Sequence, residues 1–282
     1  MHADAVQGLT LLIVSWIIGI SCVEHFDNLK ALFAEVQASN PELLSTPGPN
    51  GLFTPQFLIA SFLVILCIPI TQPQLAIRLV ILRNLRTTHL MAVAVGIFAI
   101  LVIIPTIFIG LYGAVRYPDA STPDFLSQVL LYEQPGIIAA LAVVGLLAAG
   151  LSTTDSQIFA MGTELRSLLS GSEKSKLTKT KVAIVGFAAV ALIFSIQASD
   201  QLALLARVSF AGTSLLAPMI LSAVLIRKKL GNEIIFATAL ALLTFLSSLL
   251  GLIPSSVGQL RLDLFLLLVL STFVLISNQL RR

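Results

Sequence analysis

Apolar residues run along the chain in long stretches that are separated by short polar segments. A helix needs about twenty mostly apolar residues to cross the hydrocarbon core of a bilayer. About eight stretches reach or approach this length, and they predict an all-α integral membrane protein with a single transmembrane domain, residues 1–282. The predicted spans are Val6–Val23, Phe57–Gln72, Leu90–Val115, Gly136–Phe159, Val182–Gln197, Leu202–Ile226, Ile234–Ile253 and Leu262–Ser277.

Composition agrees with this pattern and argues against catalysis. The chain is 57% hydrophobic and only 11% charged, whereas a soluble domain carries roughly a quarter charged residues. Cys22 and Cys67 both lie inside predicted spans, so we expect packing residues and no disulfide framework. None of the three histidines stands at metal-ligand spacing from another. Because no nucleotide loop, nucleophile motif or zinc helix occurs either, we expect neither an enzyme nor a bound cofactor.

The distribution of charge predicts how the chain crosses the membrane. If the N-terminus is cytoplasmic, the outer loops hold only a few of the seventeen basic residues: Lys30, Arg116, Arg207 and Arg261. The positive-inside rule then predicts a multi-pass protein of the plasma (inner) membrane with both termini cytoplasmic. Tyr112, Tyr117 and Tyr132 would lie near outer span ends, in the headgroup region. The net charge of +3 is explained by topology and contact with anionic lipid, so no nucleic acid is expected as a partner.

A polar cluster interrupts the fourth predicted span. On a helix, Ala149, Ser152, Thr153 and Ser156 share one face, since they are three or four residues apart. Hydroxyl and carbonyl oxygens in this arrangement suit a small hard cation such as sodium. Alternatively, the hydroxyls bond to the carbonyl four residues earlier or to a packed neighbour.

Prolines mark a second candidate site in the second span. Pro69 and Pro73 each remove a helical hydrogen bond, so the helix is expected to kink or unwind. Either this break lines a substrate cavity, through Gln72, Pro73 and Gln74, or the helix simply ends at the cytoplasmic surface. In the sixth span Ser214 lies beside further small residues, and substrate contact and close helix packing explain that group equally well.

Three motifs resemble the sodium:solute symporter family, which includes sodium-coupled proline, pantothenate and sugar transporters. They are A-x-x-S-T followed by x-x-S-Q from Ala149, QPQLAIRLVILR over 72–83, and FAGTSLLAP over 210–218. The resemblance implies a core of ten helices in two inverted five-helix repeats. The chain would begin at the fifth core helix, hold the whole second repeat and add two helices. Relative to the family it would be N-terminally truncated, without the first four core helices.

The resemblance also implies ion sites. Ala149, Ser152 and Thr153 match the part of the sodium site on the eighth core helix, and the first core helix would supply the remaining ligands. Asp4, Asp155 and Ser156 correspond to a possible second ion site or exit path, although Asp155 stands where some members carry a small hydroxyl residue. A charge within a span costs about 2.5 to 3.5 kcal/mol on insertion scales, but Asp155 could also lie at a solvated helix end.

The expected function is sodium-coupled symport of a small organic solute by alternating access, as a truncated or partial transporter. Its partners would be the solute, sodium as the coupling ion, the bilayer, and a separate chain that supplies the missing helices. The alternative is a non-transporting scaffold, regulatory protein or degenerate paralogue. An intramembrane enzyme is the weakest hypothesis, since Asp4 and Asp155 would be its only catalytic carboxylates.

Overall fold

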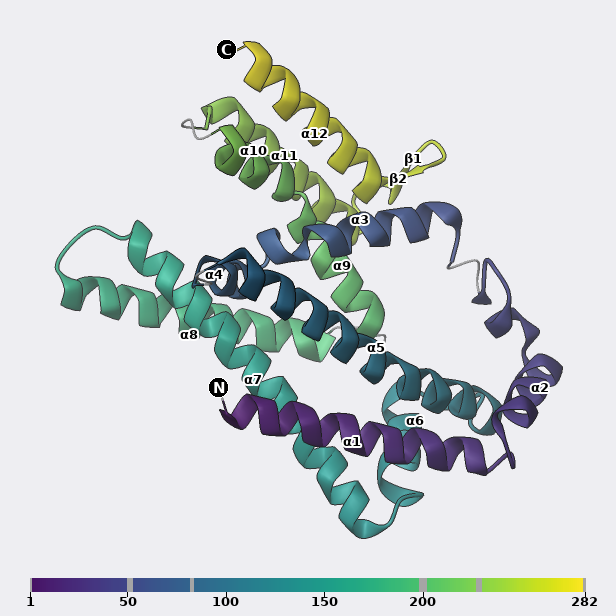
Figure 1. Cartoon of the computed structure of the whole chain (residues 1–282). Helices are drawn as coiled ribbons and strands as arrows, with labels where there is room; N and C mark the ends of the chain where they lie inside the picture. Colours follow the sequence, from purple (N-terminus) through teal and green to yellow (C-terminus); the bar gives the residue numbers. More distant parts are fainter. Residues whose placement is uncertain (1, 50–52, 82–83, 198–201, 227–229, 281–282) are drawn as a thin grey trace. The chain divides into compact units, whose positions relative to one another are not determined.

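The computed structural model describes residues 2–49, 53–81, 84–197, 202–226 and 230–280. Helices form nearly all of these ranges, as Figure 1 shows. The prediction of an all-α membrane protein is therefore confirmed. Two compact units are present, one formed by 1–50 with 81–200 and the other by 51–80 with 201–282.

The first unit is built around α1, which packs along both α5 and α7, while α8 packs against α7. A buried cluster that includes Val14, Ile18 and Tyr112 lies between α1, α5 and α7. The elements of this unit are α1 (His2–Glu24), α2 (Leu29–Ser39), the 3-10 turn η1 (Pro41–Leu44), α5 (Leu85–Arg116), α6 (Thr122–Ser127), the π-helical turn η3 (Gln128–Tyr132), α7 (Gly136–Leu168) and α8 (Glu173–Gln197).

The contact between α1 and α5 is centred on a proline inside α5. A Cβ atom added to Gly19 of α1 would lie 2.9 Å from the Cβ of Pro105, so glycine allows the two helices to approach closely here. Pro105 has no N–H to donate to the carbonyl of Leu101, four residues earlier. The indole Nε1 of Trp16 donates to this carbonyl at 2.8 Å. A neighbouring helix thus satisfies a backbone group that proline would leave unpaired in an apolar environment.

The second unit packs α3 against α9 and α10, and α12 against α10 and α11. Its core holds Val64, Leu215, Phe245 and Leu266. The short hairpin β1–β2 leads directly into α12. The elements of this unit are α3 (Pro55–Thr71), α4 (Pro73–Ile81), α9 (Leu202–Ser214), α10 (Ala217–Ile226), α11 (Asn232–Leu249), β1 (Ser256–Val257), β2 (Leu260–Arg261) and α12 (Leu262–Leu280).

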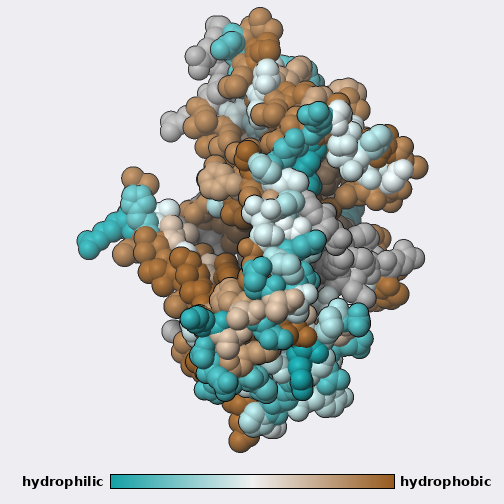
Figure 2. All heavy atoms as spheres, turned by 90° about the vertical axis from the view of Figure 1, so that its right-hand side faces the viewer, coloured by the Kyte–Doolittle hydropathy of each residue, from teal (hydrophilic) through white to brown (hydrophobic). Residues whose placement is uncertain are grey.

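Much of the outer surface is apolar, which water would disfavour and lipid tails would not. Phe62, Val95, Leu147 and Phe236 are all more than half exposed, and Figure 2 shows large brown areas on the face it draws. Six helical stretches in the described ranges are long and apolar enough to cross a membrane: Ala5–Glu24, Leu85–Arg116, Gly136–Leu168, Val208–Leu225, Asn232–Leu249 and Leu262–Leu280. The chain is therefore a multi-pass membrane protein.

Candidate functional site

The break predicted from the prolines occurs at a single residue. α3 ends at Thr71, and Gln72 has an extended backbone (φ −97°, ψ 112°) before α4 begins at Pro73. Pro73 is tolerated because the first position of a helix needs no N–H donor. Pro69 lies within α3, and the helix continues through it. The helix is thus interrupted rather than ended, since α4 follows at once.

A second interruption lies in the same unit. The predicted span Leu202–Ile226 is divided into α9 and α10 by a turn at Leu215 and Leu216. The N–H of Leu215 donates to the carbonyl of Gly212, and that of Leu216 donates to the carbonyl of Thr213. Leu215 itself is fully buried, so the turn lies within the core of the unit.

A hydrogen bond between side chains joins the two interruptions. Nε2 of Gln72 donates to Oγ1 of Thr213 at 3.0 Å, although 141 residues separate them. Gln72 is only 8% exposed, and its Oε1 accepts from Nε2 of Gln74 at 3.3 Å. Ser214 is buried, and its hydroxyl donates to the carbonyl of Ala211. The residues at the break in α3 and at the turn after α9 therefore form one polar group inside the second unit.

The predicted sodium ligands lie on α7, which is unbroken at this point. Oγ1 of Thr153 donates to the carbonyl of Ala149 at 2.9 Å, and Oγ of Ser156 donates to that of Ser152 at 2.9 Å. Such bonds to the carbonyl four residues earlier are the alternative to ion binding that was predicted from the sequence. Each hydroxyl oxygen nevertheless keeps lone pairs that could bind a further ligand. Ala149, Ser152 and Ser156 are half-buried, whereas Thr153 lies at the exposed edge of this stripe.

Only one of the two predicted acids has a side chain within the described part of the structure. Asp155 is exposed on α7, next to the half-buried Ser156. Asp4 belongs to the first turns of α1, but its side chain lies outside the described part of the structure. Within the described ranges, no group of three or more His, Cys, Asp or Glu residues could hold a metal ion.

One carboxylate cluster was not predicted. In the first unit, the hydroxyls of Tyr112 and Tyr117 both donate to Oε1 of Glu133, at 2.9 Å from Tyr112. His25 and Phe26, just after α1, pack edge-on against the Tyr112 ring. The bond to Glu133 raises the pKa of Tyr117, which lies just beyond α5. The sequence carries no signal for this pairing, since Glu133 is far from both tyrosines along the chain.

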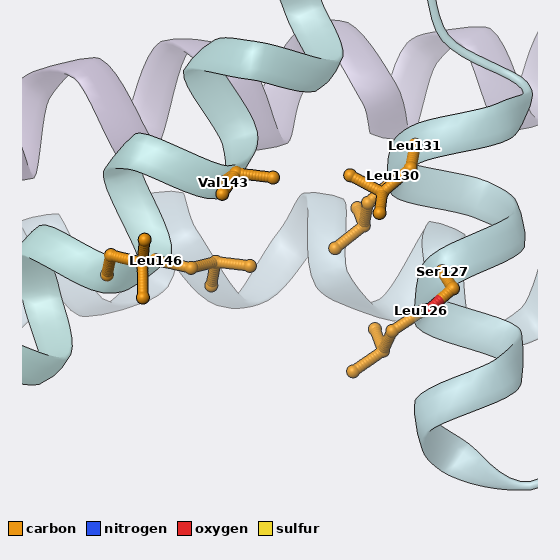
Figure 3. A pocket seen from close by; sticks show the side chains of 7 residues that line it. Leu126, Ser127, Leu130, Leu131, Val143 and Leu146 are labelled. Carbon is orange, nitrogen blue, oxygen red and sulfur yellow. The ribbon is translucent and has the colours of Figure 1, made fainter.

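A cavity of about 250 Å³ also lies in the first unit, between α7 and the segment formed by α6 and η3. Figure 3 shows leucines from both sides pointing into it. Its lining residues are Leu126, Ser127, Leu130, Leu131, Val143, Leu146 and Leu147. With a single hydroxyl among apolar groups, this space suits a hydrocarbon chain better than a polar solute. None of the predicted site residues lines it.

Sequence reasoning identified some residues of the polar group and missed one. Gln72, Pro73 and Gln74 lie at the break in α3, as the prolines suggested. Ser214 lies at the neighbouring turn but bonds to its own helix. The residue that was missed is Thr213, which accepts the bond from Gln72. The only available signal was its place in the small-residue run Gly212–Ser214, directly before the interruption.

The fold defines a multi-pass membrane protein with interrupted helices. Over 157 residues, which are 55% of this chain and 32% of the relative, the sequence is 22% identical to a sodium/pantothenate symporter of Haemophilus influenzae. The chain thus spans about a third of the length of this curated relative, which is a transporter and not an enzyme. No family model matches the chain, and no solved structure matches it.

Proposed function

We propose that the chain contributes to sodium-coupled symport of a small organic solute by alternating access. The observation that carries this proposal is the pair of interrupted helices in the second unit, joined by the bond between Gln72 and Thr213. Irregular backbone at membrane depth is tolerated where it is buried or lines a cavity, and transporters bind their substrates at such breaks. The likeness to a sodium/pantothenate symporter supports the same class of function.

In this proposal the solute binds at the break through neutral hydrogen-bonding groups. Gln72, Gln74 and Thr213 supply amides and a hydroxyl, each able to donate and to accept. An incoming solute would replace the bond between Gln72 and Thr213 with bonds of its own, so the two helices would be held together differently with and without it. Pantothenate, a compound with hydroxyl, amide and carboxylate groups, is the first solute to test.

Sodium would bind at α7, where Ala149, Ser152 and Thr153 offer a carbonyl and two hydroxyl oxygens. Thr153 donates its proton to the carbonyl of Ala149, which also accepts the N–H four residues later in the helix. The Thr153 hydroxyl would therefore turn its proton away from this carbonyl for both oxygens to present lone pairs to a cation. Ligands beyond these three would complete the site, and we propose that a further segment or separate chain supplies them. Asp4, Asp155 and Ser156 are proposed as a second ion site or exit path.

The test is uptake of labelled solute by cells that express the chain from its native locus, so that any further segment or partner is present. Sodium is compared with potassium in the medium. For the ion site, Thr153→Val is compared with Thr163→Val, because both hydroxyls donate at 2.9 Å to the carbonyl four residues earlier on α7. We expect T153V to reduce sodium stimulation at least tenfold and T163V to leave it unchanged.

The outcomes separate the hypotheses. If T153V and T163V change sodium stimulation equally, the proposed ion site on α7 is wrong. Thr213→Val is expected to raise the solute concentration needed for half-maximal uptake while sodium stimulation persists. If no solute shows sodium-stimulated uptake, pantothenate included, the proposal of symport fails. A scaffold, regulatory protein or degenerate paralogue would then be the better description.

A further inference from the structure

Several lysines lie close together at the start of α8, and none of them has a role in the proposed transport function. Lys174, Lys179 and Lys181 are all exposed, and none of them has an acidic partner within the described residues. The carboxylate of Glu173 is already matched, because it accepts from Arg166 on α7 and from Lys176 at 3.3 Å. Three positive charges therefore remain without an acidic partner over two turns of helix.

Packing against α7 fixes the directions in which these lysines leave the helix. Thr180 is buried, and an added Cβ on Gly162 of α7 would lie 3.8 Å from Cγ2 of Thr180 and 3.3 Å from Cδ1 of Ile184. This side of α8 thus faces α7 (Figure 1). Lys179 and Lys181 are the immediate neighbours of Thr180, so they leave α8 on either side of the contact. Lys174 is seven residues before Lys181 and shares its face.

The predicted membrane span Val182–Gln197 begins directly after the last lysine. From Val182 onward the helix exposes apolar side chains, with Val182 67%, Val185 68% and Phe187 62% exposed. At 1.5 Å per residue, Lys174 lies about 10 Å along the axis from Lys181. The headgroup region on each side of a bilayer is about 5 to 8 Å thick, so Lys179 and Lys181 lie at its depth. Lys174 lies just outside it, where its long side chain can extend back toward the phosphates.

We infer that these lysines, with Lys174 and Lys181 on one side of the α7 contact and Lys179 on the other, bind the headgroups of anionic phospholipids around the start of α8. Charge complementarity favours this occupant, because a phosphate that lies at the same depth as the lysines can reach them without leaving the bilayer. An acidic protein would have to approach through the headgroup layer. Each lysine near an anionic surface strengthens binding about fivefold, and the long side chains can extend to phosphates at slightly different depths.

The test uses the full chain in nanodiscs that contain equal amounts of phosphatidylglycerol and phosphatidylcholine. Native mass spectrometry then measures the ratio of the two lipids that stay bound to the protein. We expect the unchanged chain to retain phosphatidylglycerol preferentially. Replacing all three lysines by glutamine should lower that preference at least tenfold, whereas replacing them by arginine should preserve it.

Single substitutions provide a matched control if the triple variant fails to fold. Lys181→Gln should lower the preference about fivefold, while Lys30→Gln, the same change on α2, should leave it unchanged. Addition of millimolar inorganic phosphate should not displace the lipid, because the lysines of α8 are matched to headgroups held at the membrane. Equal retention of both lipids by the unchanged chain, or equal effects of K181Q and K30Q, would overturn the inference.

Discussion

At the scale of single residues, Trp16 and Pro105 form a testable pair. Proline leaves the carbonyl of Leu101 without a helical donor, and the indole supplies one at 2.8 Å. We expect Trp16→Phe to lower the free energy of unfolding by about 1 kcal/mol or more. In a Pro105→Ala background the backbone N–H of residue 105 can serve Leu101 instead, so the same change should cost less.

This double-mutant cycle is measured by thermal or denaturant unfolding in detergent. Alanine keeps the Cβ that lies near Gly19, so the packing contact is largely preserved in both backgrounds. If W16F costs the same with proline and with alanine at position 105, the indole contributes through packing alone and the assignment of its hydrogen bond is wrong.

The bond between Gln72 and Thr213 makes a second prediction at this scale. Thr213→Val removes the acceptor for a glutamine amide that is only 8% exposed. A buried donor left unpaired costs about 1 to 3 kcal/mol. Thr244→Val is the control, because Thr244 is only half-buried and its hydroxyl donates to the carbonyl of Leu240 on its own helix. Circular dichroism during thermal unfolding should show a lower midpoint for T213V and little change for T244V.

The two contacts, Trp16 with the Pro105 region and Gln72 with Thr213, show which features could be predicted from the sequence and which could not. The prolines located the break next to Gln72 because ring geometry acts locally, on the carbonyl four residues earlier. The same local rule could not say that α3 would continue through Pro69 and unwind at Gln72. Nor could it find Thr213 or Trp16 as partners, since these contacts depend on how helices distant in sequence pack together.

At the scale of helices, Gly19 controls the distance between α1 and α5. A Cβ at this position would lie 2.9 Å from the Cβ of Pro105 and 3.1 Å from its carbonyl oxygen. Gly19→Ala should therefore destabilise the first unit by about 1 to 3 kcal/mol through overpacking. Gly110→Ala on α5 is the control, because nothing lies within 4 Å of its added Cβ. Since alanine favours helix more than glycine does, G110A should unfold at the same midpoint or higher.

The turn between α7 and α8 is expected to depend on pH. Bonds from Arg166 and Lys176 hold the pKa of Glu173 below its ordinary value of 4.5. A lowered pKa means that these bonds stabilise the turn fully above pH 4.5, and that this stabilisation is lost as pH falls below 4.5 and through the lowered pKa. A spin label at Ser170 should be ordered at pH 7 and more mobile at pH 3. In the Glu173→Gln variant the label should be mobile at both pH 7 and pH 3. A label whose mobility changes neither with pH nor with the substitution would contradict the prediction.

Helix positions were predictable to the extent that apolar runs coincide with helices. α5 (Leu85–Arg116) contains the predicted span Leu90–Val115, and α12 contains Leu262–Ser277. The turn at Leu215 and Leu216 escaped prediction because both residues are apolar, so the hydrophobic run continues through it. The N–H groups of the two leucines donate to carbonyls three residues earlier. These are backbone bonds, so the hydropathy of the side chains does not reveal them.

At the scale of the whole molecule, the two units can be observed separately. Trp16 is the only tryptophan of the chain and belongs to the first unit. Its fluorescence therefore reports unfolding of that unit, whereas circular dichroism reports helices of both. We expect T213V to lower the midpoint seen by circular dichroism and to leave the fluorescence midpoint unchanged. Equal shifts of both signals would show that the chain unfolds as one cooperative body.

The two cysteines have a practical consequence for labelling chemistry. Cys22 is 1% exposed in α1, and Cys67 is half-buried in the apolar helix α3. A membrane-impermeant maleimide needs thiolate in contact with water, so a cysteine introduced into a polar loop would react far sooner than either native thiol. Loop positions can thus be assigned to one side of the membrane or the other in the otherwise unaltered chain, without first constructing a background that lacks cysteine.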